Sequence, residues 1–201
     1  MALPIACIVE GHGDREAVPI VLRRIAVSLQ IGAVNVVSSL RTPRSKLIKP
    51  GELERAVEFS ARRIDGSGAI LILIDADDDC PAQLGPELFH RAVQARRDVA
   101  IAVVLAKYEF ESWFLAAADS LSGRRGLKND LYAPTNPETI RGAKEWLSQR
   151  MEGSRTYSET LDQPALAELF DLDAARRADS FDKCYREITR LLTTPVTRDL
   201  S

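Results

Sequence analysis

An apolar run that ends in a cluster of aspartates constrains this chain more than any other feature. Residues 70–74 are all Ile or Leu, and the aspartates that follow are Asp75, Asp77, Asp78 and Asp79. Such a run is typical of a strand buried on both faces of a parallel sheet. Carboxylates this close repel one another and raise one another's pKa values unless a cation or basic partner compensates. The cluster therefore indicates metal binding, with a solvated acidic turn as the alternative.

Strand-like and helix-like segments alternate through the first half of the chain. Strands are expected at 3–9, 34–38, 69–74 and 99–106, and helices at 14–29, 50–64 and 86–96. This order predicts parallel strands joined by right-handed crossovers. We therefore expect an α/β fold, specifically a three-layer sandwich around a mainly parallel four-stranded sheet.

The strand pattern disappears after Glu109, and helical spacing replaces it. Helices are expected near 110–117, from 137 to about 151 and from Asp179 onward, with loops at 123–135 and 153–163. We therefore predict an α/β core at residues 1–118 and a helical C-terminal subdomain at 119–201. The two parts are expected to pack together as a single compact unit.

Charge and cysteine content narrow the class of protein. The net charge is −2, from 27 basic and 29 acidic residues, so contact with nucleic acid would require a local basic patch. The cysteines Cys7, Cys80 and Cys184 are odd in number and widely spaced, which predicts reduced thiols in a cytoplasmic protein. No apolar stretch reaches the roughly 18 residues that span a bilayer, so no membrane partner is expected.

Charged residues follow each predicted strand. They are Glu10 and Asp14 after the first strand, Arg41, Arg44, Lys46 and Lys49 after the second, the aspartates at 75–79 after the third, and Lys107, Glu109 and Glu111 after the fourth. Ligands of open α/β sheets gather at the carboxyl ends of the strands. Parallel strands would therefore place an acidic cluster opposite a basic loop.

This juxtaposition suits metal-assisted chemistry on phosphate esters. Carboxylate oxygens suit Mg²⁺ or Mn²⁺, which activate water and stabilise a leaving oxygen in phosphodiester hydrolysis. The expected metal ligands are Glu10, Asp14, Asp75, Asp77, Asp79 and Glu111. Arg41, Arg44 and Lys46 would hold the phosphate backbone, unless this stretch is only a solvated loop. Zinc fits poorly, because His12 and His90 do not have a zinc-ligand spacing.

Several of these residues also have structural interpretations. Glu10 would alternatively accept hydrogen bonds from backbone amides at the first helix, and Asp14 would alternatively be the N-cap of that helix. Lys107 suits a charge-neutralising partner, a general acid or a surface lysine equally well. Glu109 and Glu111 cannot face the same way on a regular helix, so at most one is expected to point into the site.

A phosphatase is an alternative function for the same aspartates. Asp75 would be its nucleophile and Asp77 its general acid/base, and a lysine after the next strand would suit it. This interpretation leaves Glu10 without a role. The sequence contains no G-x-x-x-x-G-K-[ST] loop, which excludes a P-loop ATPase.

Two short motifs carry a resemblance to the Toprim fold. They are Ile8-Val9-Glu10-Gly11 and Ile74-Asp75-Ala76-Asp77. Topoisomerases, bacterial primases and overcoming-lysogenization-defect (OLD) type nucleases share that fold. Nearly the whole chain is similar to a prokaryotic family catalogued as domain of unknown function 4276. The further motifs of that similarity are 9–13, 75–81, 106–113, 142–146, 162–164 and 180–181.

The Toprim resemblance implies roles for individual residues. Glu10 matches the Toprim acid, and Asp75 and Asp77 match its metal-binding pair, which acts with Mg²⁺ to make or break phosphodiester bonds. OLD-type nucleases complete the site with further acids and a lysine, for which Asp14, Glu111 and either Lys107 or Lys144 are the candidates. Such nucleases normally carry an ATPase domain, so a separate ATPase partner is a hypothesis for this chain.

These inferences predict a Mg²⁺-dependent nuclease that acts on nucleic acid. The expected catalytic residues are Glu10, Asp75, Asp77 and Lys107, and the expected phosphate-binding residues are Arg41, Arg44, Lys46 and Lys144. One alternative is a non-catalytic or partner-dependent Toprim-like module of a defence or toxin-type system. The other is the small-molecule phosphatase. Self-association into a homo-oligomer is left open.

Overall fold

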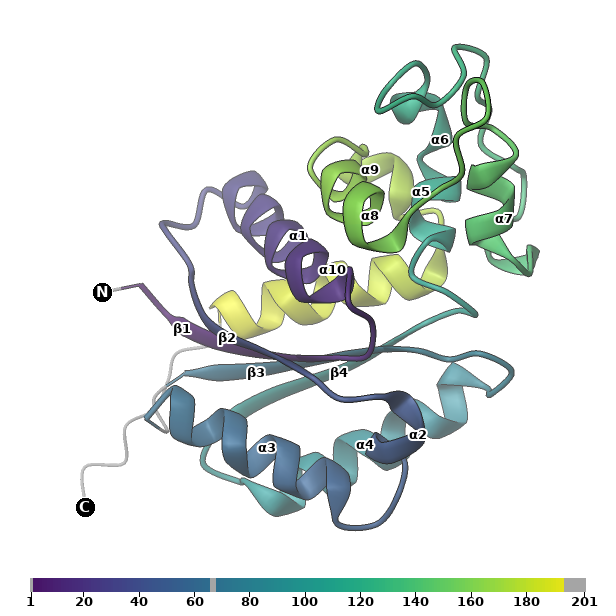
Figure 1. The fold of residues 1–201 in the computed structure, drawn as a ribbon. Coiled ribbons are helices and arrows are strands. Elements are labelled where there is room, and N and C mark those ends of the chain that lie inside the picture. Colours follow the sequence, from purple (N-terminus) through teal and green to yellow (C-terminus); the bar gives the residue numbers. More distant parts are fainter. Residues whose placement is uncertain (1, 66–67, 194–201) are drawn as a thin grey trace.

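Four parallel strands form the centre of the computed structural model, which describes residues 2–65 and 68–193 (Figure 1). The strands are β1 (Pro4–Val9), β2 (Asn35–Arg41), β3 (Ala69–Asp75) and β4 (Ala100–Ala106). Their spatial order is β2-β1-β3-β4, and all three pairings are parallel. The carboxyl ends of all four strands therefore meet at one edge of the sheet, as the strand order predicts.

Helices cover both faces of this sheet (Figure 1). One face carries α1 (Asp14–Ser28) and α10 (Asp179–Thr193), and the other carries α3 (Glu52–Arg63) and α4 (Pro81–Ala95). Alternate residues of β1 serve the two layers. Cys7 and Val9 are buried with the residues of α1 and α10, whereas Ala6 and Ile8 are buried with those of α3 and α4. The fold is thus a three-layer α/β sandwich, which confirms the predicted class.

Short helices fill the second half of the chain before α10 returns to the sheet. They are α5 (Ser112–Ala116), α6 (Ala118–Leu121), α7 (Ala143–Ser148), α8 (Glu159–Ala167) and α9 (Leu172–Ala175), with a 3₁₀ turn at Pro137–Thr139. Edge-to-face aromatic contacts join them to α10: Trp113 and Phe170 both contact Phe181. Because α10 packs on β4 and α8 packs on α1, the helical half also completes one layer of the sandwich.

Three predicted element boundaries were wrong. Helix α4 begins at Pro81, which occupies the first helical turn, and Pro86 lies inside the helix that it was expected to begin. The helix expected over 137–151 is interrupted, because Gly142 adopts a left-handed conformation (φ 71°) immediately before α7. The loop expected at 153–163 contains the start of α8, whose helical pattern is obscured by Pro164.

The domain boundary expected at residue 118 stays a prediction, and the last part of the expected subdomain, 194–201, lies outside the described residues. The basic loop expected at 41–49 contains one short helix, α2 (Arg44–Leu47). No helix within the described ranges is long and apolar enough to cross a membrane.

Candidate metal and phosphate site

A cavity of about 240 Å³ lies at the carboxyl ends of β1 and β3. We call it the acid pocket, and its lining residues are Glu10, Gly11, His12, Asp14, Arg41, Pro43, Asp75, Glu111, Lys144, Glu159 and Gln163. The loops after three strands contribute to it, as does the helical half through α7 and α8. The structure therefore brings together four of the expected metal ligands and two of the expected phosphate-binding residues.

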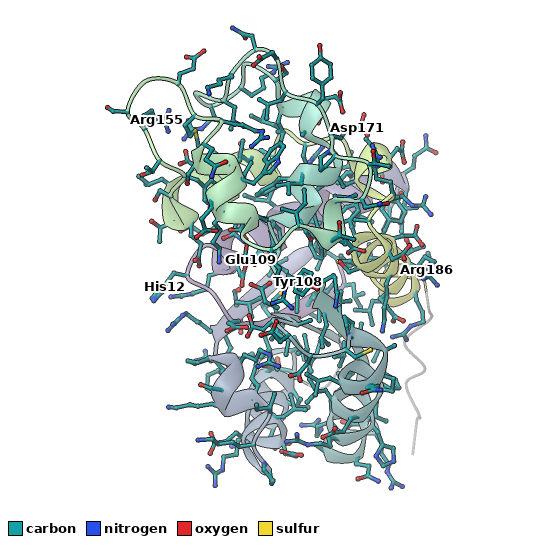
Figure 2. The ribbon with its side chains drawn as sticks, turned by 90° about the vertical axis from the view of Figure 1, so that its right-hand side faces the viewer. His12, Tyr108, Glu109, Arg155, Asp171 and Arg186 are labelled. Carbon is teal, nitrogen blue, oxygen red and sulfur yellow. The ribbon has the colours of Figure 1, made fainter. Side chains whose placement is uncertain are left out.

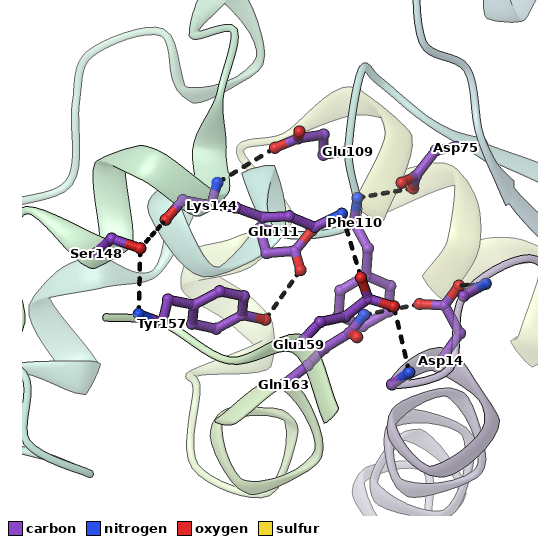
Figure 3. Close-up of polar contacts among 12 residues, drawn as sticks. Asp14, Asp75, Glu109, Phe110, Glu111, Lys144, Ser148, Tyr157, Glu159 and Gln163 are labelled. Carbon is purple, nitrogen blue, oxygen red and sulfur yellow. Dashed lines mark hydrogen bonds and ion pairs between the residues drawn. The ribbon is translucent and has the colours of Figure 1, made fainter. Parts of the chain in front are cut away.

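Asp75, the last residue of β3, lies at the base of the acid pocket. Its Oδ1 accepts a hydrogen bond of 2.8 Å from the backbone N–H of Phe110 (Figure 3). Burial raises the pKa of Asp75 well above its ordinary range, and the charges of Glu111 and Asp14 raise it further, while Lys144 lowers it. A carboxyl group of this kind favours a cation that would compensate its buried charge.

Glu10 follows β1 and faces the same cavity. Burial raises the pKa of Glu10, and the negative charge of Asp77 raises it further. Backbone groups of Asp75 and Arg44 lower the pKa in part. The Oε2 of Glu10 is buried and has no hydrogen-bond partner among the described residues. The backbone groups that lower the Glu10 pKa belong to Asp75 and Arg44, and not to the first helix, where the structural interpretation expected them. One Glu10 oxygen stays available to a ligand.

Asp14 begins α1, and its side chain is 5% exposed. One carboxylate oxygen accepts a hydrogen bond of 2.8 Å from the Gly11 N–H, and the other accepts one of 2.7 Å from Nε2 of Gln163. Burial is the main cause of its raised pKa. Asp14 therefore orders the loop after β1 and lines the acid pocket. The expected helix-capping role is not observed, because Gly13 occupies the N-cap position and no side chain of the described residues caps α1. Metal binding by Asp14 stays a prediction.

Glu111 is the most deeply buried acid of the pocket, at 1% exposure. Its Oε1 accepts a 2.9 Å hydrogen bond from the Tyr157 hydroxyl, and its Oε2 has no hydrogen-bond partner among the described residues (Figure 3). Burial raises the pKa of Glu111 to about 7, against the lowering by Lys144 and Tyr157. Near neutral pH the protonated and the ionised forms of Glu111 are therefore both populated.

Lys144 supplies the positive charge of the pocket. Its Nζ lies 3.8 Å from Oε2 of Glu111 and 3.6 Å from Oε2 of Glu159. Burial alone would lower the pKa of Lys144, but Glu111, Asp75 and Glu159 raise it on balance, so the amine stays protonated. The backbone N–H of Lys144 donates a 3.2 Å hydrogen bond to Oε2 of Glu109 (Figure 3). Both Glu109 and Glu111 therefore contact Lys144, but only Glu111 is among the lining residues of the acid pocket.

The other three aspartates lie on the rim and not in the pocket. Asp77, Asp78 and Asp79 are each more than half exposed. Arg44 pairs with both Asp77 and Asp79, and Arg141 pairs with Asp78. Two of the expected metal ligands therefore neutralise an arginine in this structure. Asp77 nevertheless stays close enough to Glu10 for its charge to raise the Glu10 pKa.

The expected basic residues are divided between two places. Arg41 lines the acid pocket and Arg44 adjoins it, whereas Lys46 is exposed to solvent. Lys107 lies elsewhere: its Nζ stands 4.4 Å from the centre of the Tyr108 ring, and it lines a separate cavity. Figure 2 shows Tyr108 and Glu109 at the middle of this face, between the sheet layers and the helical half, with His12 to one side.

Three residues of the site were not predicted from the sequence: Tyr157, Glu159 and Gln163. Glu159 accepts a 3.3 Å hydrogen bond from the Gly13 N–H, and Gln163 donates to Asp14. All three fall in the segment that was expected to be a loop without a function. The one available signal was Gln163, which belongs to a motif of the family resemblance.

The family model described as a domain of unknown function (DUF4276) matches residues 9–189. The chain belongs to the DUF4276 family. No curated protein and no solved structure matches it. The DUF4276 match spans every lining residue of the acid pocket, from Glu10 to Gln163.

The donor set of this DUF4276 pocket fits Mg²⁺ or Mn²⁺. All of its acidic side chains offer carboxylate oxygens, the ligands that these ions prefer. Buried Oε2 atoms of Glu10 and Glu111 lack hydrogen-bond partners among residues 2–65 and 68–193. Within the same ranges, no group of three or more His, Cys, Asp or Glu side chains could hold a metal ion in the positions described here. The acids are held by Phe110, Gln163 and Tyr157 instead.

Proposed function

We propose that this DUF4276 protein is a Mg²⁺-dependent phosphodiester-processing protein, acting on nucleic acid as a Toprim-type nuclease. One observation carries the proposal: Glu10, Asp14, Asp75 and Glu111 converge on a single pocket at the carboxyl edge of a parallel sheet. Their pKa values are all raised, chiefly by burial, so the pocket favours a cation. The basic residues Arg41 and Arg44 stand beside it.

The chain's own groups divide into two roles. Glu10 and Asp75, with Asp77 at the rim, would hold the metal ion. When bound, the ion supplies an activated water and charge neutralisation at the leaving oxygen. Arg41, Arg44 and Lys46 would hold phosphate oxygens of the strand on either side of the scissile bond. Lys144 lowers the pKa values of Glu111 and Asp75 against the effect of burial and offers a positive charge inside the pocket.

The positions of the two lysines support one of the two candidates for the lysine of a Toprim-type site. Lys144 lines the acid pocket, whereas Lys107 faces the Tyr108 ring and a different cavity. We therefore assign the expected lysine role to Lys144. The phosphatase alternative loses support for the same reason, because it relied on the lysine that follows β4.

Cleavage assays with matched variants test this proposal. Labelled single-stranded and double-stranded DNA and RNA are incubated with Mg²⁺ or Mn²⁺ and with wild-type protein, Glu10→Gln or Asp75→Asn. The proposal expects metal-dependent cleavage that both variants abolish while their unfolding transitions stay cooperative. Asp78→Asn is the control, because Asp78 is 78% exposed and pairs with Arg141 outside the acid pocket. Cleavage unchanged in Asp75→Asn would contradict the proposal. Cleavage that occurs only after an ATPase is added would favour the partner-dependent form.

A further inference from the structure

A second cavity, of about 550 Å³, lies at the same carboxyl edge of the sheet beside the edge strand β4. The start of α4, the end of β4, residues 135–139 and the start of α10 enclose it. We call it the lysine cavity after Lys107 and Lys183, which line it. It shares no lining residue with the acid pocket. One short loop nevertheless connects the two, because Asp75 lines the acid pocket and Cys80 lines the lysine cavity.

Three basic residues line the lysine cavity, Lys107, Arg177 and Lys183, together with two acids, Glu138 and Asp179, and the two lysines are available to an anion. Both are partly buried, and within the described part of the chain neither pairs with a carboxylate. Glu138 also lines the cavity, but its two oxygens accept hydrogen bonds from the N–H groups of Asp179 (2.9 Å) and Ser180 (3.0 Å). Its charge is therefore committed to the start of α10.

The remaining walls combine apolar and amide surface. Pro81, Leu105 and Pro137 present apolar groups, and Asn136 presents a side-chain amide. Ligand sites typically have apolar walls with a few placed polar groups. Two ammonium groups suit phosphate oxygens, and the mixed wall suits the sugar and base attached to that phosphate. The volume is more than twice that of the acid pocket, so a whole nucleotide fits where a bare ion would leave space.

We propose that the lysine cavity binds one nucleotide unit of the nucleic acid strand, with Lys107 and Lys183 at its phosphate. The inference rests on the proposed function, because it places a neighbouring part of the same strand beside the acid pocket. It assigns Lys107 to substrate binding and not to the reacting groups. The substrate is accordingly a strand with an unpaired nucleotide near the scissile phosphate, since a base-paired nucleotide could not enter the cavity.

The reactivity of Cys80 provides a direct test. Cys80 is exposed and lines the cavity, whereas Cys7 and Cys184 are fully buried. The rate of Cys80 alkylation by iodoacetamide is followed by mass spectrometry in EDTA, with thymidine 5′-monophosphate, thymidine or inorganic phosphate added. Nucleotide at tenfold its dissociation constant should slow alkylation about tenfold, because about nine-tenths of the sites are then occupied. Thymidine and inorganic phosphate should each protect much less at the same concentration.

Variants that each remove one lysine charge complete the test. Lys183→Gln and Lys107→Gln should each weaken nucleotide binding about tenfold, the loss expected for one charge-assisted contact. The same nucleotide concentration should then slow alkylation only about twofold, because about half of the sites are occupied. Lys128→Gln is the control, because the Lys128 amine only donates to the Gln149 carbonyl on the surface of the helical half. Alkylation that the nucleotide leaves unchanged would overturn the proposal, and so would equal protection in wild type and both cavity variants. Equal protection by inorganic phosphate would reduce the cavity to a simple anion site and also overturn it.

Failure of this inference and failure of the proposed function are distinguishable. The alkylation assay contains EDTA and measures no cleavage, so it does not depend on a metal in the acid pocket. Cleavage with no nucleotide protection at Cys80 would reject the lysine cavity alone. Protection at Cys80 with no cleavage would reject the nuclease and leave a nucleotide-binding module.

Discussion

The hydroxyl of Tyr157 donates a 2.9 Å hydrogen bond to Oε1 of Glu111, and this bond ties the helical half of the chain to the acid pocket. The N–H of Tyr157 donates 3.1 Å to Oγ of Ser148, which in turn donates to the carbonyl of Lys144 (Figure 3). The same segment thus delivers both the partner and the counter-charge of Glu111. The helical half is therefore a structural part of the pocket.

Replacing Tyr157 with Phe should lower the free energy of unfolding. The change leaves a buried carboxylate oxygen without its donor, which costs about 1–3 kcal/mol. Urea unfolding at pH 7 measures the difference. Tyr132→Phe is the matched control, because the Tyr132 side chain is 77% exposed. Equal stability of the two variants would show that the Tyr157 bond does not hold the halves together.

Stability should fall as the pH rises from about 4.5 to about 7. Burial raises the pKa of Glu111 from 4.5 to about 7, so the folded state binds more protons than the unfolded state over this interval. The upward pKa shifts of Glu10, Asp14 and Asp75 act in the same direction. From Glu111 alone the expected loss is about 3 kcal/mol. Urea titrations at pH 5, 6, 7 and 8 without metal measure it.

Glu111→Gln identifies the source of that pH dependence. The neutral amide retains an oxygen for the Tyr157 hydroxyl but has no proton to lose as the pH rises. The variant should show a shallower decline of stability with pH than wild type. A profile as steep as that of the wild type would mean that Glu111 keeps an ordinary pKa.

Lys144→Gln should destabilise the protein more at pH 8 than at pH 5. At pH 8 Glu111 is ionised and loses its neighbouring cation, whereas at pH 5 Glu111 is protonated in the folded state. Removing one partner of a buried pair costs about 3–5 kcal/mol, and partial exposure of Lys144 reduces this to about 1–3 kcal/mol. Lys128→Gln, at a surface lysine, should change stability little at either pH. A pH-independent loss would contradict this role of Lys144.

Gly13→Ala should destabilise the contact between the two halves. An added Cβ would collide with the Oε1 of Gln163 and the backbone carbonyl of Glu159, and the backbone has little freedom to yield. Overpacking of this kind costs about 1–3 kcal/mol or more. Gly32→Ala is the control, because no atom lies within 4 Å of its added Cβ. The midpoints of urea unfolding compare the two variants, and equal midpoints would mean that α8 is not docked as described.

The sheet and its acidic edge could be predicted because the signals are local. An apolar run and the acids that follow it identify β3 with Asp75, and β1 with Glu10. Parallel pairing then places both acids together, as the acid pocket shows. The start of α4 could not be predicted, because Pro81 and Pro86 are both suited to a first helical turn. The sequence pattern predicted a start at Pro86, whereas the helix begins at Pro81.

The contribution of the helical half could not be read from local pattern. Tyr157, Glu159 and Gln163 reach the pocket only because α8 packs against α1, a contact between segments far apart in the chain. Lys107 shows the converse. It directly follows a strand whose end meets the site edge, yet its side chain turns to Tyr108 and the lysine cavity. Strand order places a residue at an edge but does not choose which cavity its side chain enters.

The most direct test of the central claim is metal binding measured by calorimetry at pH 6.5. Mg²⁺ and Mn²⁺ are titrated separately into wild type, Asp75→Asn and the control Asp78→Asn, each in two buffers of different ionisation enthalpy. Binding is expected in wild type and in Asp78→Asn, with release of protons as the raised pKa values of the pocket acids fall. Binding should be at least about tenfold weaker in Asp75→Asn, because the ion loses a charged ligand. The absence of metal-dependent heat at millimolar concentrations, or equal binding in all three proteins, would contradict the central claim.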